Sequence, residues 1–234
     1  MSITRRTTLA ALAMLTTLPV FATPGKPLRL GVIGAGHLGG AVGRGWVKSG
    51  HEVMFASRHP ENLQPWVQPL GNRASVGTPG QAAAFGDVIL IAVPYGAIPQ
   101  LGQEIAPLLK GKVVLDAANP YGSEPLAIEA KTQGAGPTTA KYFPGALLVR
   151  AFNAVDATAI EASDANSPAT IGVPIAGDDA TAVAIAAQLV VDAGCTPVVV
   201  GKLAEASRFQ PGGPGFRANT SAQQLRQLLG LSPS

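Results

Sequence analysis

A glycine-rich turn between an apolar run and an amphipathic run constrains this chain more than any other feature. Residues 34–39 read Gly-Ala-Gly-His-Leu-Gly and follow directly on the mostly apolar residues 28–33. In this spacing Gly34 permits a tight turn, Gly36 lets a ligand approach the backbone, and Gly39 lets a helix pack on the strand. Backbone amides at the start of that helix would face a diphosphate. This arrangement predicts a dinucleotide-binding site.

Short runs rich in Val, Ile and Leu alternate with helix-length stretches along the rest of the chain. Most of these runs are continuously apolar, which is typical of parallel strands buried on both faces. We expect strands at 28–33, 52–56, 73–76, 88–93, 112–116, 147–152, 170–176 and 196–200. We expect helices at 38–49, 60–67, 80–85, 98–109, around 128–131, 157–161 and 179–193. The pattern predicts an α/β fold with a doubly wound, mainly parallel sheet of the Rossmann type.

The end of the second expected strand indicates which dinucleotide is preferred. At this position an enzyme that prefers NAD usually carries an acidic residue, which binds the ribose 2′-hydroxyl. This chain has Ser57 and Arg58 instead. Arg58 can pair with the oxygens of a 2′-phosphate, and Ser57 can donate a hydrogen bond to them. NADP is therefore the expected cofactor; the alternative is that Arg58 is a solvated loop residue.

The first 22 residues have the layout of an export signal. Arg5 and Arg6 precede a mostly apolar run at 9–20, and no acidic residue is present. The run is shorter than a membrane span, which needs about 20 residues. The paired arginines favour a twin-arginine signal peptide, with the general secretory route as the alternative. We therefore expect a periplasmic or otherwise exported protein and leave 1–22 out of the fold.

Composition excludes several other classes of protein. With 47% hydrophobic and 13% charged residues, the chain is not expected to be disordered. The net charge is only +3, and the leader supplies two of the 17 basic residues, so a nucleic-acid partner is not expected. The single cysteine, Cys195, rules out an internal disulfide and a multi-thiolate metal site. We expect Cys195 to be a buried structural thiol.

Side chains suited to acid–base catalysis are sparse, and the catalytic residues stay unassigned. None of the three tyrosines has a lysine four residues later, and no histidine follows His59. We expect His51 and His59 to be exposed, and His37 to be either a surface turn residue or a ligand contact. Aspartates at strand ends, such as Asp116, are expected to cap or solvate loops, and we expect no metal site. Hydride exchange between two aligned rings suits such a site, because it needs little help from a protein acid.

Several segments resemble the family of coenzyme F420-dependent NADP oxidoreductases, whose fold is also similar to the cytoplasmic reductase domain of six-transmembrane metalloreductases. The segments are 31–39, 50–53 with 56–58, 116–120 (Asp-Ala-Ala-Asn-Pro), 149–153 (Val-Arg-Ala-Phe-Asn) and 176–179. The resemblance covers about residues 28–212. It implies a compact NADP-binding fold that transfers hydride between the nicotinamide and a flavin-like ring, that of F420 or of a flavin.

The same resemblance assigns binding residues by position. The diphosphate would be touched by Ala35, Gly36, His37 and Leu38, and the 2′-phosphate by Ser57 and Arg58. The ribose and nicotinamide side would be lined by Val93 and Pro94. The reacting ring would lie near Asn119 and Asn153.

We expect one NADP-binding domain at 27–203, followed by a C-terminal segment at 204–234. That segment contains a breaker-rich loop, 210–216, which is either a plain connector or a flap over a ligand, and a short helix at 221–229. The expected partner is a small-molecule redox acceptor, and such folds commonly form homodimers. Two other functions stay open: a non-catalytic NADP-binding or sensor protein, and a small-carbonyl or imine reductase that takes its acid from the C-terminal segment or from a partner subunit.

Overall fold

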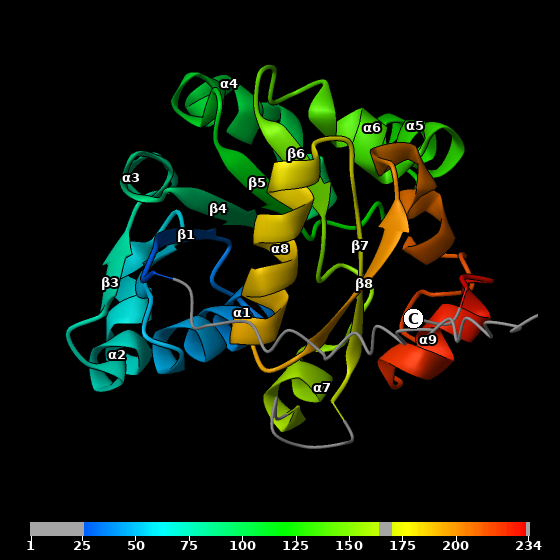
Figure 1. Cartoon of the computed structure of the whole chain (residues 1–234). Coiled ribbons are helices and arrows are strands. Elements are labelled where there is room, and N and C mark those ends of the chain that lie inside the picture. Colours follow the sequence, from blue (N-terminus) through cyan, green and yellow to red (C-terminus); the bar gives the residue numbers. More distant parts are fainter. Residues whose placement is uncertain (1–25, 164–169, 233–234) are drawn as a thin grey trace, which may run out of the picture.

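The computed structural model describes residues 26–163 and 170–232, so the expected export signal at 1–22 lies outside the described residues. One eight-stranded sheet runs through this part of the chain, in the order β3-β2-β1-β4-β5-β6-β7-β8 (Figure 1). The strands are β1 (Arg29–Ile33), β2 (Glu52–Ala56), β3 (Ala74–Gly77), β4 (Val88–Ile91), β5 (Val113–Asp116), β6 (Leu147–Arg150), β7 (Gly172–Gly177) and β8 (Thr196–Gly201). The strands from β1 to β6 are parallel. The fold is therefore the expected Rossmann-type α/β fold with a mainly parallel sheet.

The last two strands reverse direction. β7 pairs antiparallel with β6, and β8 pairs parallel with β7. Only the two pairs Val149–Gly177 and Arg150–Ala176 join β6 to β7. Because the final residues of both strands pair, the first part of β7 projects past the carboxyl end of β6.

Helices cover both faces of the sheet. The α-helices are α1 (His37–Lys48), α2 (Gln64–Val67), α3 (Pro79–Phe85), α4 (Ile98–Leu109), α5 (Pro125–Gln133), α6 (Ala135–Ala140), α7 (Ala157–Ala162), α8 (Ala180–Asp192) and α9 (Ala222–Leu228). The 3₁₀ helices are η1 (Pro60–Leu63), η2 (Gln68–Leu70), η3 (Tyr95–Ala97) and η4 (Leu203–Phe209). α1, α7 and α8 pack on one face and α3 to α6 on the other, while η4 and α9 lie against β7 and β8 (Figure 1).

Burial explains why the strands could be recognised in the sequence. Every residue of β4 and of β5 is buried, and for the apolar residues of both strands the sequence predicts this. α8 begins where the Asp179 carboxylate accepts from the Ala182 amide at 2.8 Å, and it ends before Gly194, whose φ is 84°. All eight expected strands are present. The sequence did not predict α6 or η4.

Cys195 is buried, as expected, and desolvation raises the pKa of its thiol to about 11. The expectation that His51 is exposed is wrong: only 4% of it is accessible. Its Nε2 lies 2.9 Å from Asp192 Oδ2, and its Nδ1 accepts from the Leu28 amide at 3.1 Å. His51 therefore ties the start of the sheet to the end of α8.

Candidate dinucleotide site

The glycine turn between β1 and α1 has the geometry that its sequence predicts. Gly34 has φ +96°, and a Cβ there would lie 2.4 Å from the carbonyl oxygen of Ala92. A Cβ on Gly39 would lie 2.3 Å from the Gly34 carbonyl oxygen, so the helix packs directly on the turn. A Cβ on Gly36, in contrast, would meet no atom within 4 Å. Gly36 therefore borders the space that a ligand would fill.

The first turn of α1 offers backbone donors to that space. Gly36 is the N-cap of the 12-residue helix, and it has no side chain to accept from the first amides. An α-helix leaves these amides without intrahelical partners, and its dipole makes this end positive. The turn thus fits the diphosphate of a dinucleotide.

A cavity of about 720 Å³ opens on one side of this turn. Gly34, Ala35 and Gly36 line it together with Ser57 and Arg58. Arg58 is exposed and makes no hydrogen bond or ion pair within the part of the chain that the structure describes. The hydroxyl oxygen of Ser57 accepts from the His59 amide at 3.0 Å, which leaves its own proton for another acceptor. The residues present fit a 2′-phosphate.

A second cavity of about 750 Å³ opens on the other side, at the carboxyl ends of β4, β5 and β6. Its walls include His37, Leu38, Asn119, Tyr121, Asn153, Asp156, Phe216 and Arg217. The two cavities share Ala92, Val93, Pro94, Gly96 and Ala97, so they adjoin along this segment, and the two together are called the groove below. All of the predicted binding residues border this groove except Gly39, which packs inside the turn. His37 and Leu38 face the second cavity, whereas Ala35 and Gly36 face the first.

Two titratable side chains of the second cavity are held by the fold. The Tyr95 hydroxyl donates to the Ala135 carbonyl at 3.0 Å and accepts from Thr139, and burial raises the pKa of Tyr95 to about 12. The hydrogen bond from Arg217, at 2.8 Å, holds the pKa of the Asp156 carboxyl below its ordinary value. Neither group is free to give a proton to a ligand near neutral pH.

The sequence left open whether the loop at 210–216 covers a ligand. In the structure, Phe216 and Arg217 form part of the cavity wall. The backbone of Arg217 has φ 52° and its amide donates to the Ala154 carbonyl at 2.8 Å. No local pattern indicated this placement, because it depends on contacts with residues some sixty positions earlier in the chain.

The expectation that Asp116 is a loop-capping or solvated residue is wrong. Asp116 and Arg150 are both fully buried and form an ion pair, with Arg150 Nη1 2.8 Å from Asp116 Oδ2. The two residues end neighbouring strands and lie opposite each other in register. A charged residue at the end of each of two apolar strands was the available signal for this pair.

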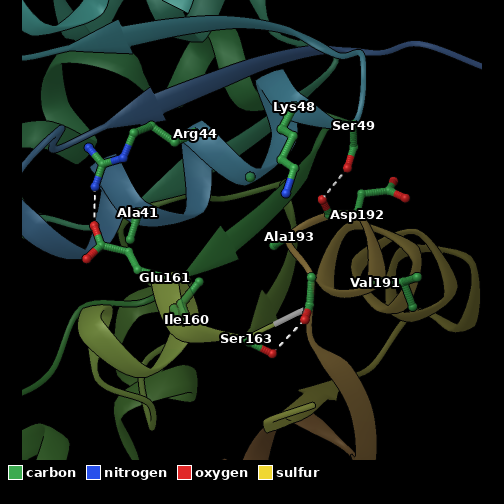
Figure 2. A pocket seen from close by; sticks show the side chains of 12 residues that line it. Ala41, Arg44, Lys48, Ser49, Ile160, Glu161, Ser163, Val191, Asp192 and Ala193 are labelled. Carbon is green, nitrogen blue, oxygen red and sulfur yellow. Dashed lines mark hydrogen bonds and ion pairs between the residues drawn. The ribbon is translucent and has the colours of Figure 1, made fainter. Parts of the chain in front are cut away.

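Another hollow, of about 460 Å³, lies between α1, α7 and the end of α8 (Figure 2). It shares no lining residue with the groove. Arg44 pairs with Glu161, and Ser49 and Ser163 donate to main-chain carbonyls of Asp192 and Gly194 at 2.6 Å each. These polar groups are satisfied within the fold. Among the described residues no group of three or more His, Cys, Asp or Glu side chains could hold a metal ion, and no helix is long and apolar enough to cross a bilayer.

Fold and groove together define a dinucleotide-binding protein of the Rossmann class. Residues 29–120 match the family model described as NADP oxidoreductase, coenzyme F420-dependent. The chain is 28% identical over 192 residues to the metalloreductase STEAP3 of Rattus norvegicus. That match covers 80% of this chain and 36% of STEAP3, so the chain spans about a third of that relative.

Solved structures show the same fold. The hypothetical protein SMa0349 of Sinorhizobium meliloti superposes with a TM-score of 0.71 at 26% identity, covering 80% of this chain and 92% of that one. A putative F420-dependent NADP reductase of Arthrobacter sp. FB24 has a TM-score of 0.66 at 24% identity. The match covers 77% of this chain and 87% of that one. An imine reductase of Myxococcus stipitatus gives 0.57 at 20% identity, with coverage of 78% and 57%. The chain is thus similar over residues 29–120 to NADP oxidoreductases, and it shares the fold of these solved structures.

Proposed function

We propose that the protein transfers hydride between NADP(H) and a flavin-like ring, that of F420 or of a flavin. The observation that carries the proposal is the pair of adjoining cavities, which meet at the segment 92–97 beside the glycine turn. At one end Ser57 and Arg58 line the first cavity, where Arg58 has no partner among the described residues, and at the other end Asn119 and Asn153 border the second cavity of about 750 Å³. The glycine turn lies between these ends.

The chain's own residues would bind the cofactor in three places. Arg58 would pair with the 2′-phosphate, and the amides at the start of α1 would bind the diphosphate. Val93 and Pro94, in the wall shared by both cavities, would direct the nicotinamide into the second cavity. The bound cofactor supplies the hydride from its nicotinamide ring.

The second cavity favours a flat acceptor. Tyr121 and Phe216 give it an aromatic wall, and the ion pair of Arg217 and Asp156 lies in the same cavity. Tyr95 and Asp156 are hydrogen-bonded within the fold, so neither of these two side chains would serve as the acid of a reaction that needs one. Alignment of two rings in a water-poor cleft is the main requirement for hydride exchange with a flavin-like ring.

Oxidation of NADPH, followed by its absorbance, tests the proposal. The purified protein is expected to oxidise NADPH with F420 or with a flavin, and to bind NADPH without either. Binding without oxidation in the presence of F420, flavins and ferric chelates would contradict it. A ligand-induced change of association state without turnover would instead support the non-catalytic sensor. Turnover of small ketones or imines would support the third alternative, which the imine reductases of similar fold make worth including.

We also propose that residues 1–22 direct export through the twin-arginine route. This route carries folded proteins, so the cofactor could be loaded before export. Replacing Arg5 and Arg6 by lysine is expected to keep the protein inside the cell, as measured by fractionation. Mass spectrometry of the exported protein is expected to detect retained NADP(H). If the variant with both substitutions is still exported, the general secretory route would be favoured.

A further inference from the structure

A buried ion pair anchors the loop that leads from β5 into the second cavity. Besides its bond to Asp116, Arg150 Nη1 donates to the Ala118 carbonyl at 2.6 Å. The other carboxylate oxygen of Asp116 accepts from the Ala118 amide at 3.0 Å. No part of either charged side chain is accessible to solvent. The guanidinium therefore fixes both the strand end and the loop.

Arg150 reaches the cavity through Asn119. Its Nη2 donates to Asn119 Oδ1 at 3.3 Å, and Asn153 Nδ2 donates to the same oxygen at 3.3 Å. Asn119 Nδ2 in turn donates to the Asn153 carbonyl at 2.7 Å. Asn153 is itself 3% exposed, and its Nδ2 also donates to the Phe209 carbonyl at 3.0 Å. Arg150 and Asn153 thus both hold the Asn119 amide, and Asn153 is in turn tied to η4.

These bonds determine which way the Asn119 amide faces. If the amide were rotated by half a turn, its NH₂ group would meet the donors of Arg150 and Asn153. In the observed orientation its oxygen accepts two hydrogen bonds and its nitrogen uses one of two hydrogens. The second hydrogen has no acceptor in the described part of the chain. Asn119 is half-buried and lines the second cavity.

We propose that Arg150 is a positioning residue, which holds Asn119 as a hydrogen-bond donor to an oxygen of the nicotinamide riboside half of the dinucleotide. The ribose hydroxyls and the carboxamide carbonyl are the oxygens of that half. The inference rests on the proposed function, since that function places the nicotinamide in the second cavity. Arg150 acts through Asn119 and does not touch the ligand.

The test compares two ligands that share the 2′-phosphate end. NADP⁺ carries the nicotinamide riboside half, and adenosine 2′,5′-bisphosphate lacks it. Asn119→Leu removes the donor and leaves the ion pair in place, while Arg150→Lys keeps the charge but loses the planar fork that reaches Asn119. Each variant is expected to weaken NADP⁺ binding about tenfold, as loss of one hydrogen bond would, and to change bisphosphate binding less than about twofold. Calorimetric titration measures both dissociation constants.

The double variant separates positioning from a merely structural role. If Arg150 acts through Asn119, adding Arg150→Lys to Asn119→Leu is expected to cause no further loss of NADP⁺ affinity. Additive losses would overturn the inference, and so would equal weakening of both ligands. Unchanged NADP⁺ affinity in Asn119→Leu would also overturn it, even if Arg150→Lys failed to fold. A folded wild-type protein that bound neither ligand would refute the proposed function together with this inference.

Discussion

The ring of Phe216, near the end of the chain, packs edge-on against the ring of Tyr121, which follows β5. The ring centroids lie 6.4 Å apart and the planes meet at 62°. Such edge-to-face geometry is favourable for aromatic pairs. The contact makes the C-terminal segment part of the cavity wall. Substitutions in that segment are therefore expected to change how tightly the acceptor binds.

Phe216→Ala is expected to raise the KM for a flavin-like acceptor about five- to tenfold, because an aromatic contact of about 1 kcal/mol is lost. The dissociation constant of NADPH is expected to stay unchanged. Steady-state kinetics and a binding titration measure the two constants. Leu228→Ala is the matched control, since Leu228 is 53% exposed on α9 and outside the groove. An equal loss of affinity for NADPH would contradict the assignment of Phe216 to the acceptor part of the second cavity.

Arg58→Ala is expected to weaken NADPH binding by about 10- to 100-fold while it leaves NADH binding nearly unchanged. The reason is the loss of a charge-assisted hydrogen bond to the 2′-phosphate. His37→Ala is the comparison variant, because His37 borders the other cavity. It is expected to keep the ratio of the two affinities. If Arg58→Ala kept that ratio as well, Arg58 would not be the 2′-phosphate ligand.

Of two substitutions in the glycine turn, one is expected to weaken nucleotide binding and the other to destabilise the fold. A methyl group at Gly36 meets no atom, so Gly36→Ala is expected to keep the melting temperature and to weaken nucleotide binding. A methyl group at Gly39 would collide with the Gly34 carbonyl, so Gly39→Ala is expected to lower the melting temperature. Thermal denaturation and nucleotide titration distinguish the two. A lower melting temperature of Gly36→Ala would argue against open space beside Gly36.

The bond between Asp156 and Arg217 is expected to stabilise the fold in a pH-dependent way. Arg217 and Asn219 lower the pKa of Asp156 below 3.8, so the folded state favours the ionised form. This contribution is present above pH 3.8 and is lost as the pH falls through the lowered pKa. The difference in melting temperature between wild type and Asp156→Asn is therefore expected at pH 7 and should shrink toward pH 3. A difference independent of pH would assign the effect to packing.

Local sequence predicted those features that depend on neighbouring residues. The start and end of α8 follow from Asp179 and Gly194, and the glycine turn follows from its spacing. The sequence does not predict α6, because Ala-Gly-Pro-Thr-Thr-Ala has no helical pattern of apolar residues. The placement of this helix depends on packing against η4.

The sequence-based expectations about burial are wrong where a polar residue has a partner far away in the chain. His51 is buried because Asp192, 141 residues later, pairs with it. Asp116 is buried because Arg150 lies beside it, although 34 residues separate them in the chain. Burial of a charge requires such a partner, and one sequence does not say which residues will meet.

The projecting end of β7 holds the C-terminal segment in place close to the second cavity. The Gly172 amide there donates to the Thr220 carbonyl at 2.8 Å, just after the wall residues Phe216 and Arg217. Arg58 and the glycine turn, in contrast, lie within the matched segment 29–120. If the proposed function holds, substitutions in the late stretch can change the acceptor during evolution without touching Arg58 or the glycine turn.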